Sequence, residues 1–258
     1  MKRNFLLIVL MLALLLPTCC TAEGSDAART FEGPGYDSAE EAALAYIEAF
    51  NAGDVPGMLS TFAIETYVDH VDRQATMERL RAFTITAQDT NPMPTPYVRD
   101  LLVSERYGEI AERLNTQYLL YAMPEEYGDD PYRAVPFKSD DRSQEIRNFL
   151  SAFDSSPVNA WIGNIAFVGF VPPEELIGEN FLDERNQRNI ESFVTYRGCD
   201  EIAELILQIQ ISGEDWYQCL ECGRYGDRWY VQSLMGNAAL LLGLDSYSSG
   251  LVPADEVS

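Results

Sequence analysis

The chain has 258 residues, of which 41 are Asp or Glu and 18 are Lys or Arg, so its formal net charge at pH 7 is −23. A nucleic-acid-binding surface needs clustered Lys and Arg against the phosphates, and this charge balance excludes nucleic acid as a partner. Hydrophobic residues make up 47% of the chain and aromatic residues 11%, which are values of a packed globular protein. The length fits about one large domain or two small ones.

The first segment has the pattern of an export signal. Lys2 and Arg3 precede an unbroken apolar run of twelve residues, 5–16, which ends at Pro17. A membrane-spanning helix needs about 20 apolar residues, so the run predicts a signal peptide over residues 1–18. We therefore expect an extracytoplasmic protein, either on the outer face of the cell membrane or secreted.

Two cleavage positions compete behind this run. The sequence Leu16-Pro17-Thr18-Cys19 resembles a bacterial lipobox, in which the Cys is lipidated and becomes the new N-terminus. The alternative, Cys20-Thr21-Ala22, is a small-x-small site that would release a protein beginning at Glu23. We favour lipidation of Cys19, followed by a tether over residues 19–35, and we expect the membrane to be contacted only through this lipid.

Removal of residues 1–18 leaves 16 basic residues against 41 acidic ones, a net charge of −25. Lys138 is then the only lysine, and His70 is the only histidine of the chain. This scarcity leaves almost no amine for Schiff-base chemistry and excludes a metal site built from several histidines. We predict no cofactor and no metal. His70, beside Asp69 and Asp72, suits an acid/base role, but a solvated helix face is the simpler interpretation.

The body of the chain begins with helical patterns. Ser38-Ala39-Glu40-Glu41 is a capping box, and Gly53 follows the apolar helical repeat where a left-handed residue ends a helix. Asp54 is a candidate cap for a second short helix. Helical periodicity continues in four further segments, over residues 67–83, 97–121, 143–153 and 184–196.

The end of the chain alternates between apolar and polar residues, which is typical of strands. We expect one strand within residues 161–171, terminated by Pro172 and Pro173. Three more strands are predicted over residues 202–211, 216–224 and 229–235, with turns at 212–215 and 225–228.

These turns predict a register and two distinct sheet faces. We expect Ile211 opposite Trp216, Leu207 opposite Leu220, Leu205 opposite Cys222, Cys222 opposite Val231 and Arg224 opposite Trp229. One face is then apolar and must be covered by the helices. The other, with Glu204, Ile206, Tyr217, Glu221 and Tyr230, is expected to be exposed and to offer a surface for a homodimer.

Polar residues interrupt the apolar face at three positions, which are Gln218, Arg224 and Ser233. With Trp216 and Trp229 they form our candidate ligand-binding set, in which an arginine over an indole would clamp a carboxylate or planar ligand. The alternative is that Arg224 only lies along Trp229 with its charge in water. No catalytic residue is predicted.

Cys219 and Cys222 form a CxxC pattern within a predicted strand. Residues three apart in a strand point to opposite faces and lie about 10 Å apart, beyond the reach of a disulfide. Cys199 lies outside the paired part of its strand. We therefore predict no disulfide among these three cysteines.

Two ends of the chain resemble the nuclear-transport-factor-two-like, or SnoaL-like, superfamily. The similarity lies in Tyr36-Asp37-Ser38 with Glu40, Glu41, Ala42, Tyr46 and Ala49, in Gly53-Asp54 and Met58–Ala63, and in Tyr225–Val231 with Ser233-Leu234. The short helix that Gly236-Asn237 would begin is similar to that of uncharacterised secreted or lipid-anchored bacterial proteins. The resemblance implies a cone-like curved antiparallel sheet covered by the N-terminal helices, with residues 67–155 as a large helical insertion.

The sequence therefore predicts a single α+β domain over residues 36–245, followed by a flexible tail over residues 246–258. Its expected function is non-catalytic binding of a small apolar or mixed-polarity ligand, or of a partner protein. The alternative is a pocket enzyme of the isomerase, dehydratase or hydrolase type, which uses a buried carboxylate or Tyr for proton transfer.

Overall fold

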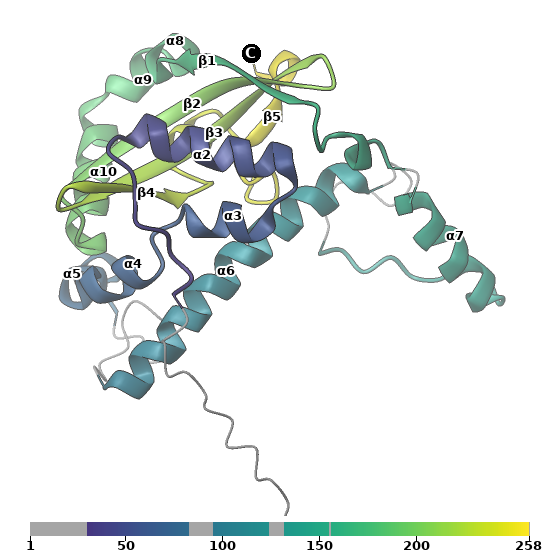
Figure 1. The fold of residues 1–258 in the computed structure, drawn as a ribbon, viewed down its shortest axis with the longest axis horizontal. Coiled ribbons are helices and arrows are strands. Elements are labelled where there is room, and N and C mark those ends of the chain that lie inside the picture. Colours follow the sequence, from purple (N-terminus) through teal and green to yellow (C-terminus); the bar gives the residue numbers. More distant parts are fainter. Residues whose placement is uncertain (1–29, 83–94, 124–131, 155, 258) are drawn as a thin grey trace, which may run out of the picture. The chain divides into compact units, whose positions relative to one another are not determined.

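The computed structural model of the chain describes residues 30–82, 95–123, 132–154 and 156–257 (Figure 1). The predicted signal peptide, Cys19 and residues 19–29 of the predicted tether lie outside the described residues. Among the helices that are described, none is both long and apolar enough to cross a membrane.

Helices occupy most of the first half of the described chain. The helices before the first strand are α2 (Ala39–Ala52), α3 (Val55–Ser60), α4 (Glu65–His70), α5 (Arg73–Leu80), α6 (Pro96–Ala122), α7 (Arg142–Asp154) and the 3-10 helix η3 (Pro157–Ala160). The strands are β1 (Ile165–Val171), β2 (Glu201–Ile211), β3 (Glu214–Tyr225), β4 (Arg228–Ser233) and β5 (Leu251–Pro253). The remaining helices are α8 (Pro173–Ile177), α9 (Glu179–Leu182), α10 (Glu184–Arg197), α11 (Asn237–Leu241) and the 3-10 helix η4 (Ala254–Glu256).

The predicted caps position α2 and α3. The Ser38 hydroxyl accepts a hydrogen bond from the Glu41 amide at 3.1 Å, and Gly53 ends α2 with a left-handed φ of 66°. Asp54 then caps α3 by accepting from the Gly57 amide at 3.0 Å. The helix expected over residues 67–83 is instead two helices, α4 and α5, because Asp72 leaves the helical conformation and caps α5.

The predicted tether is too long at its C-terminal end. Phe31 stacks on Tyr107 of α6 with ring centroids 4.3 Å apart, and the Glu32 carboxylate accepts from the amides of Ile64 and Thr66 at 2.6 and 2.9 Å. Glu32 thereby satisfies amides at the start of α4 that have no partner within the helix. The packed unit therefore begins at Phe31, not at residue 36.

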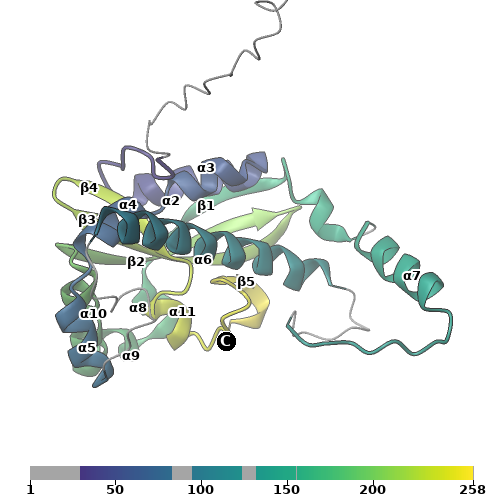
Figure 2. The ribbon, with the colours of Figure 1, turned by 90° about the horizontal axis from the view of Figure 1, so that it is seen from below.

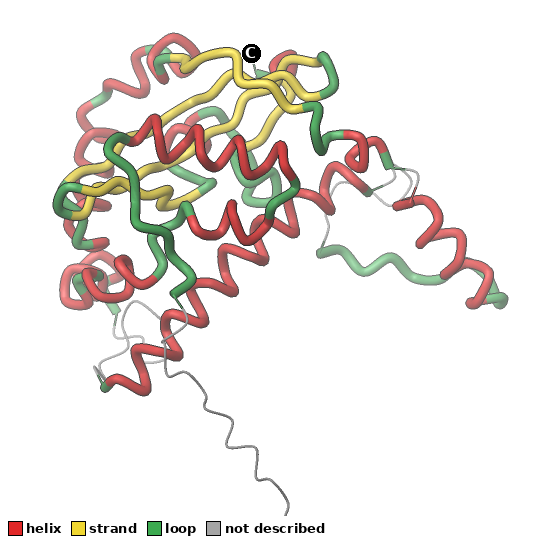
Figure 3. The backbone as a smooth tube through the Cα atoms, viewed as in Figure 1, coloured by secondary structure: helices red, strands yellow, loops and turns green. Residues whose placement is uncertain are grey.

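The sheet is antiparallel, in the order β1-β2-β3-β4, and β5 pairs with another part of β3 (Figure 3). The predicted register of β3 with β4 is confirmed, since Cys222 pairs with Val231 and Arg224 with Trp229. The predicted register of β2 with β3 is wrong by two residues, because Ile209 and not Ile211 pairs with Trp216.

The turn between β2 and β3 explains this difference. Ser212 and Gly213 both have left-handed φ values, 56° and 90°, as a two-residue hairpin turn requires, whereas the predicted pairing of Ile211 with Trp216 leaves four residues between the strands. Side chains alternate with a period of two along a strand, so a two-residue shift changes partners but leaves every side chain on its predicted face.

A bulge changes the face of Ser233. Glu221 pairs with Ser233 and Cys222 with Val231, so Gln232 is an extra residue in β4. Ser233 consequently lies on the face of Glu221, opposite to the one predicted, and Leu234 takes its place in the apolar core, where it is 1% exposed.

The apolar sheet face is covered by the N-terminal helices, as predicted. Figure 2 shows α2 and α3 on one side of the strands and α8 to α11 on the other. The core under α2 and α6 holds the fully buried rings of Tyr46 and Phe50, which pack against Leu207, Ile209 and Leu220 of the sheet. The fold is therefore α+β, with helices against both faces of one open antiparallel sheet.

The second sheet face is not exposed over its middle, contrary to our expectation. Ile206 and Cys219 are fully buried in a smaller core with Ala238 and Ala239 of α11. The short helices α8, α9 and α11 provide this cover, and the predicted homodimer surface at these positions is not accessible.

The C-terminal segment is not the tail that we predicted. Leu251 is fully buried, and β5 pairs with Trp216, Tyr217 and Gln218 of β3. The Tyr121 hydroxyl of α6 donates to the Leu251 carbonyl. The packed unit therefore extends through this segment and does not stop at residue 245.

Candidate functional site

Two of the predicted site residues lie in the packed interior. Trp216 is 7% exposed and makes edge contacts with Tyr121 and Trp161, at centroid distances of 5.2 and 5.4 Å. The Gln218 side-chain amide donates to the carbonyls of Cys219 and Ser249 at 2.9 and 3.0 Å, and its oxygen accepts from Gln117 at 3.1 Å. These groups fill the space in which we expected a ligand.

Arg224 and Trp229 lie together, but far from Trp216. The Arg224 guanidinium is 5.9 Å from the centre of the Trp229 ring, and it also bonds the Glu201 carboxylate at 3.2 Å and the Gly226 carbonyl at 2.8 Å. Trp216 and Arg224 are eight positions apart along β3, a distance of about 27 Å. The five predicted residues therefore do not form one pocket.

The other sequence candidates have structural roles. The His70 Nδ1 atom lies 2.7 Å from the Thr66 carbonyl, and its neighbours Asp69 and Asp72 are engaged by Arg99 and by the Ala75 amide. Cys199, Cys219 and Cys222 are buried free thiols, which confirms that they form no disulfide. Within the described residues, no group of three or more His, Cys, Asp or Glu side chains is arranged to hold a metal.

A layer of buried charge separates the second sheet face from α10 and α11. Glu204 of β2 and Glu221 of β3 are directly paired across the two strands, and both are buried. Arg197, the last residue of α10, forms an ion pair with Glu221. Burial raises the pKa of the Glu204 carboxyl above its ordinary value. Ionisable groups rarely lie this deep without a partner, so the layer marks a candidate site.

Gly236 and Asn237 lie directly against this layer. The Glu204 carboxylate accepts from the amides of Asn237 and Ala238 at 2.8 and 3.1 Å and so caps α11, whose Gly236 has no side chain to do so. A Cβ atom at Gly236 would clash with the Glu204 carboxylate and approach the Glu221 Cβ to 2.8 Å. The glycine is therefore required for the close approach of this turn to the sheet.

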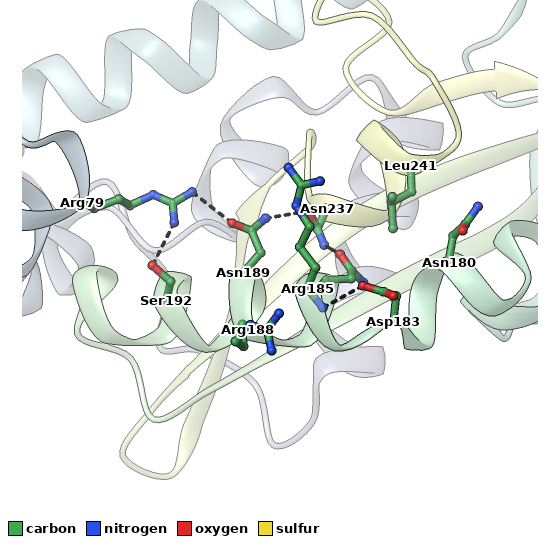
Figure 4. A pocket seen from close by; sticks show the side chains of 10 residues that line it. Arg79, Asn180, Asp183, Arg185, Arg188, Asn189, Ser192, Asn237 and Leu241 are labelled. Carbon is green, nitrogen blue, oxygen red and sulfur yellow. Dashed lines mark hydrogen bonds between the residues drawn. The ribbon is translucent and has the colours of Figure 1, made fainter.

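A chain of hydrogen bonds runs from α5 through α10 to α11 (Figure 4). Arg79 donates to Ser192 at 2.8 Å and to the Asn189 side-chain oxygen at 3.2 Å. The Asn189 amide donates to Asn237 at 3.0 Å, and the Asn237 amide donates to Asn186. Each side chain is held by the next, so this polar wall is preorganised.

The wall borders a pocket of about 650 Å³, which we call the Asn237 pocket. Its polar lining residues are Arg79, Arg185, Arg188, Asp183, Ser192, Asn180, Asn186, Asn189 and Asn237 (Figure 4). Leu241 is the apolar member of this lining. Arg79 is used by the wall, and Arg188 pairs with Glu184 at 3.2 Å, whereas the Arg185 guanidinium makes no hydrogen bond within the described chain. The pocket thus offers guanidinium and carboxamide donors, which suit an anionic, hydrogen-bonding ligand.

Sequence reasoning missed this site, although signals for it were present. Ile206, Tyr217 and Cys219 interrupt the supposedly exposed face with apolar groups, which indicates a cover. The apolar residues at 229 and 231 are two positions apart, but the next one, at 234, follows three positions later. This break in the alternation indicates the bulge that places Ser233 beside Glu221.

No family model and no curated protein matches the chain. Among solved structures, the chain is similar to a cystatin-like protein from Ruminococcus gnavus, with 18% sequence identity and a TM-score of 0.43. The similarity covers 88% of this chain and 42% of that protein, so the chain spans less than half of its length.

Proposed function

We propose that the protein is an extracytoplasmic, lipid-anchored, non-catalytic domain that binds a small organic anion of mixed polarity in the Asn237 pocket. One observation carries the proposal: three arginines and four asparagines line one pocket of a chain whose net charge is −23. The carboxamides would bind uncharged oxygens of the ligand, while Arg185 and Arg188 would bind its anionic group.

The export pattern of residues 1–18 and the lipobox-like residues before Cys19 support the location. Mass spectrometry of the mature N-terminus tests it, because a lipidated protein begins at a diacylated Cys19. An unmodified N-terminus at Glu23 would refute the anchor and leave secretion. Membership of the nuclear-transport-factor-two-like superfamily stays a prediction from the sequence. A homodimer also stays a prediction, but the middle of the second sheet face, which α11 covers, does not offer the surface for it.

The packed interior argues against a purely apolar ligand at the predicted residues. Leu207, Ile209 and Leu220 are fully buried by protein side chains, and the Gln218 amide is satisfied by protein groups. The Asn237 pocket is polar in almost all of its lining residues. A ligand of mixed polarity therefore fits better than an apolar one.

For the alternative function, proton transfer by a buried carboxylate, Glu221 is held in an ion pair with Arg197, which leaves its buried neighbour Glu204 as the candidate to consider in this layer. Its raised pKa suits a general acid, but both of its oxygens accept backbone amides at the start of α11. A group held in this way supports the fold and the position of Asn237. The geometry therefore favours binding over catalysis.

Native mass spectrometry of the protein purified from its own host tests the binding proposal. We expect a co-purifying anionic ligand that is lost in the double variant Arg185→Gln/Arg188→Gln. The matched control is Arg142→Gln/Arg147→Gln, which removes the same charge from the exposed surface of α7. Retention of the ligand in the pocket variant, or its loss in both variants, would contradict the proposal.

A further inference from the structure

A second, smaller cavity lies between α4, α6, α10 and β4. It has a volume of about 220 Å³, and Ser233 and Met235 line it shortly before the chain reaches Asn237. Its charged lining residues are Arg106, Glu109, Arg113 and Arg197. We call it the Arg106 cavity.

Arg106 is held rigidly in the wall of this cavity. It is 8% exposed, its guanidinium lies 4.5 Å from the centre of the Tyr67 ring, and its Nη2 atom donates to the Gln232 carbonyl at 2.7 Å. Its Nη1 atom lies 3.2 Å from the Glu109 carboxylate. The Nε atom is buried and has no hydrogen-bond partner within the described residues. A buried hydrogen-bond donor without an acceptor lowers the stability of the fold, so the cavity lacks one hydrogen-bond acceptor for Arg106.

The charge of the cavity is also unbalanced. Arg113 lies 3.7 Å from the same Glu109 carboxylate, and Arg197 is paired with Glu221 of the sheet. Arg106 and Arg113 thus share the single carboxylate of Glu109, which leaves an excess of one positive charge on the α6 side of the cavity. A partly buried positive excess in a strongly acidic protein favours an anion from solution.

We propose that the Arg106 cavity binds a small tetrahedral oxyanion, phosphate or sulfate. Arg106 and Arg113 approach from α6 and Arg197 from α10, so the donors come from different sides, which suits an anion with oxygens in several directions. A cavity of 220 Å³ accommodates such an ion with a few waters, each of which occupies about 30 Å³. The proposal is independent of the ligand in the Asn237 pocket, because the two linings share no residue.

Isothermal titration calorimetry tests the proposal, with inorganic phosphate and, separately, sulfate added to the protein purified from its host. Ionic strength is held constant with sodium chloride. We expect Arg113→Gln to weaken binding at least fivefold, because it removes a donor that is partly exposed. Glu109→Gln removes the carboxylate that competes for Arg106 and Arg113, so it should tighten binding at least threefold.

Two control variants make the same charge changes outside the cavity. Arg147→Gln on α7 removes a positive charge, and Glu105→Gln on α6 removes a negative charge from an exposed position. Both should leave the affinity within twofold of the unmodified protein. Binding of either ion that responds in opposite directions to the two cavity variants supports the proposal. Absence of binding, or equal changes in cavity and control variants, would overturn it and leave an adventitious ion only.

Discussion

Glu204 is the residue on which the candidate site most depends, and its replacement gives the sharpest test of the structure. In Glu204→Ala, the buried amides of Asn237 and Ala238 lose their acceptor. Each unsatisfied buried group costs about 1–3 kcal/mol, so the free energy of unfolding should fall by about 2–6 kcal/mol. Domains of this kind are stable by about 5–15 kcal/mol, so the loss is a large part of the total.

Glu204→Gln separates hydrogen bonding from charge. A carboxamide keeps one oxygen acceptor but turns an NH₂ group toward the second amide, so we expect a loss of about 1–3 kcal/mol from one unsatisfied donor. Unlike the carboxyl, the carboxamide does not titrate, so this variant carries no cost of burying an ionised group.

The sign of the pH dependence follows from burial. Because desolvation raises the pKa of Glu204 above its ordinary value of 4.5, the folded state holds a proton that the unfolded chain has already released. The contribution of Glu204 to the free energy of unfolding is therefore fully present below pH 4.5. It is lost as the pH rises through the pKa of the folded state, by at most about 1.4 kcal/mol per pH unit. The stability gap between the unmodified protein and Glu204→Gln should narrow as the pH rises.

Urea denaturation at pH 5 and pH 8 measures this gap, with the fluorescence of the buried Trp161 and Trp216 as the signal. Burial also raises the pKa of Glu32, but that contribution is the same in both proteins and cancels in the difference. If the difference in free energy of unfolding between the unmodified protein and Glu204→Gln does not depend on pH, the burial of the Glu204 carboxyl is refuted. An alanine variant as stable as the unmodified protein would refute its role as the cap of α11.

Three further predictions concern the packing of the fold. Phe50→Ala should lower the free energy of unfolding by about 3–5 kcal/mol in urea denaturation, since the ring is fully buried against Tyr118 and Trp161. Deletion of residues 246–258 removes β5 and the buried Leu251, so circular dichroism should show loss of the cooperative thermal transition, which a true tail would leave unchanged. The third prediction uses a Cys19→Ser/Cys20→Ser background, in which the remaining thiols are those of Cys199, Cys219 and Cys222. These thiols should react with a chromogenic disulfide reagent only after unfolding, because each is buried and burial raises its pKa. Rapid labelling of the native protein would contradict their buried placement.

The parts of the fold that were predicted correctly are those that local chemistry determines. The cap at Ser38 and the left-handed Gly53 depend on a few neighbouring residues, and the structure has both. The pairing of β3 with β4 near Cys222 follows from a short turn, and it is confirmed. The face that the N-terminal helices cover was predicted because a period of two identifies it without any knowledge of the partner helices.

The parts that were missed depend on contacts between distant segments. Helices α8 and α9 contain only five and four residues, which is too short for a helical period to be recognised, and α11, with five residues, was expected only from the resemblance at Gly236-Asn237. Without them, Glu204 and Glu221 have the pattern of a solvent-exposed face, whereas in the structure they are buried under α10 and α11. The candidate site consists largely of such residues, and a polar residue in a strand pattern does not indicate whether water or protein lies above it.

Net charge alone would also have concealed the two pockets. Of the 16 basic residues that follow residue 18, six line the Asn237 pocket or the Arg106 cavity, and three of these six belong to α10. An anion approaching from a distance meets the field of the whole acidic molecule, which repels it, but salt screens this field beyond about 8 Å at physiological ionic strength. At hydrogen-bonding distance the nearby guanidinium groups dominate the interaction. We therefore expect the chain to reject a polyanion such as nucleic acid, which would contact much of its surface, and still to bind a small anion that contacts only these arginines.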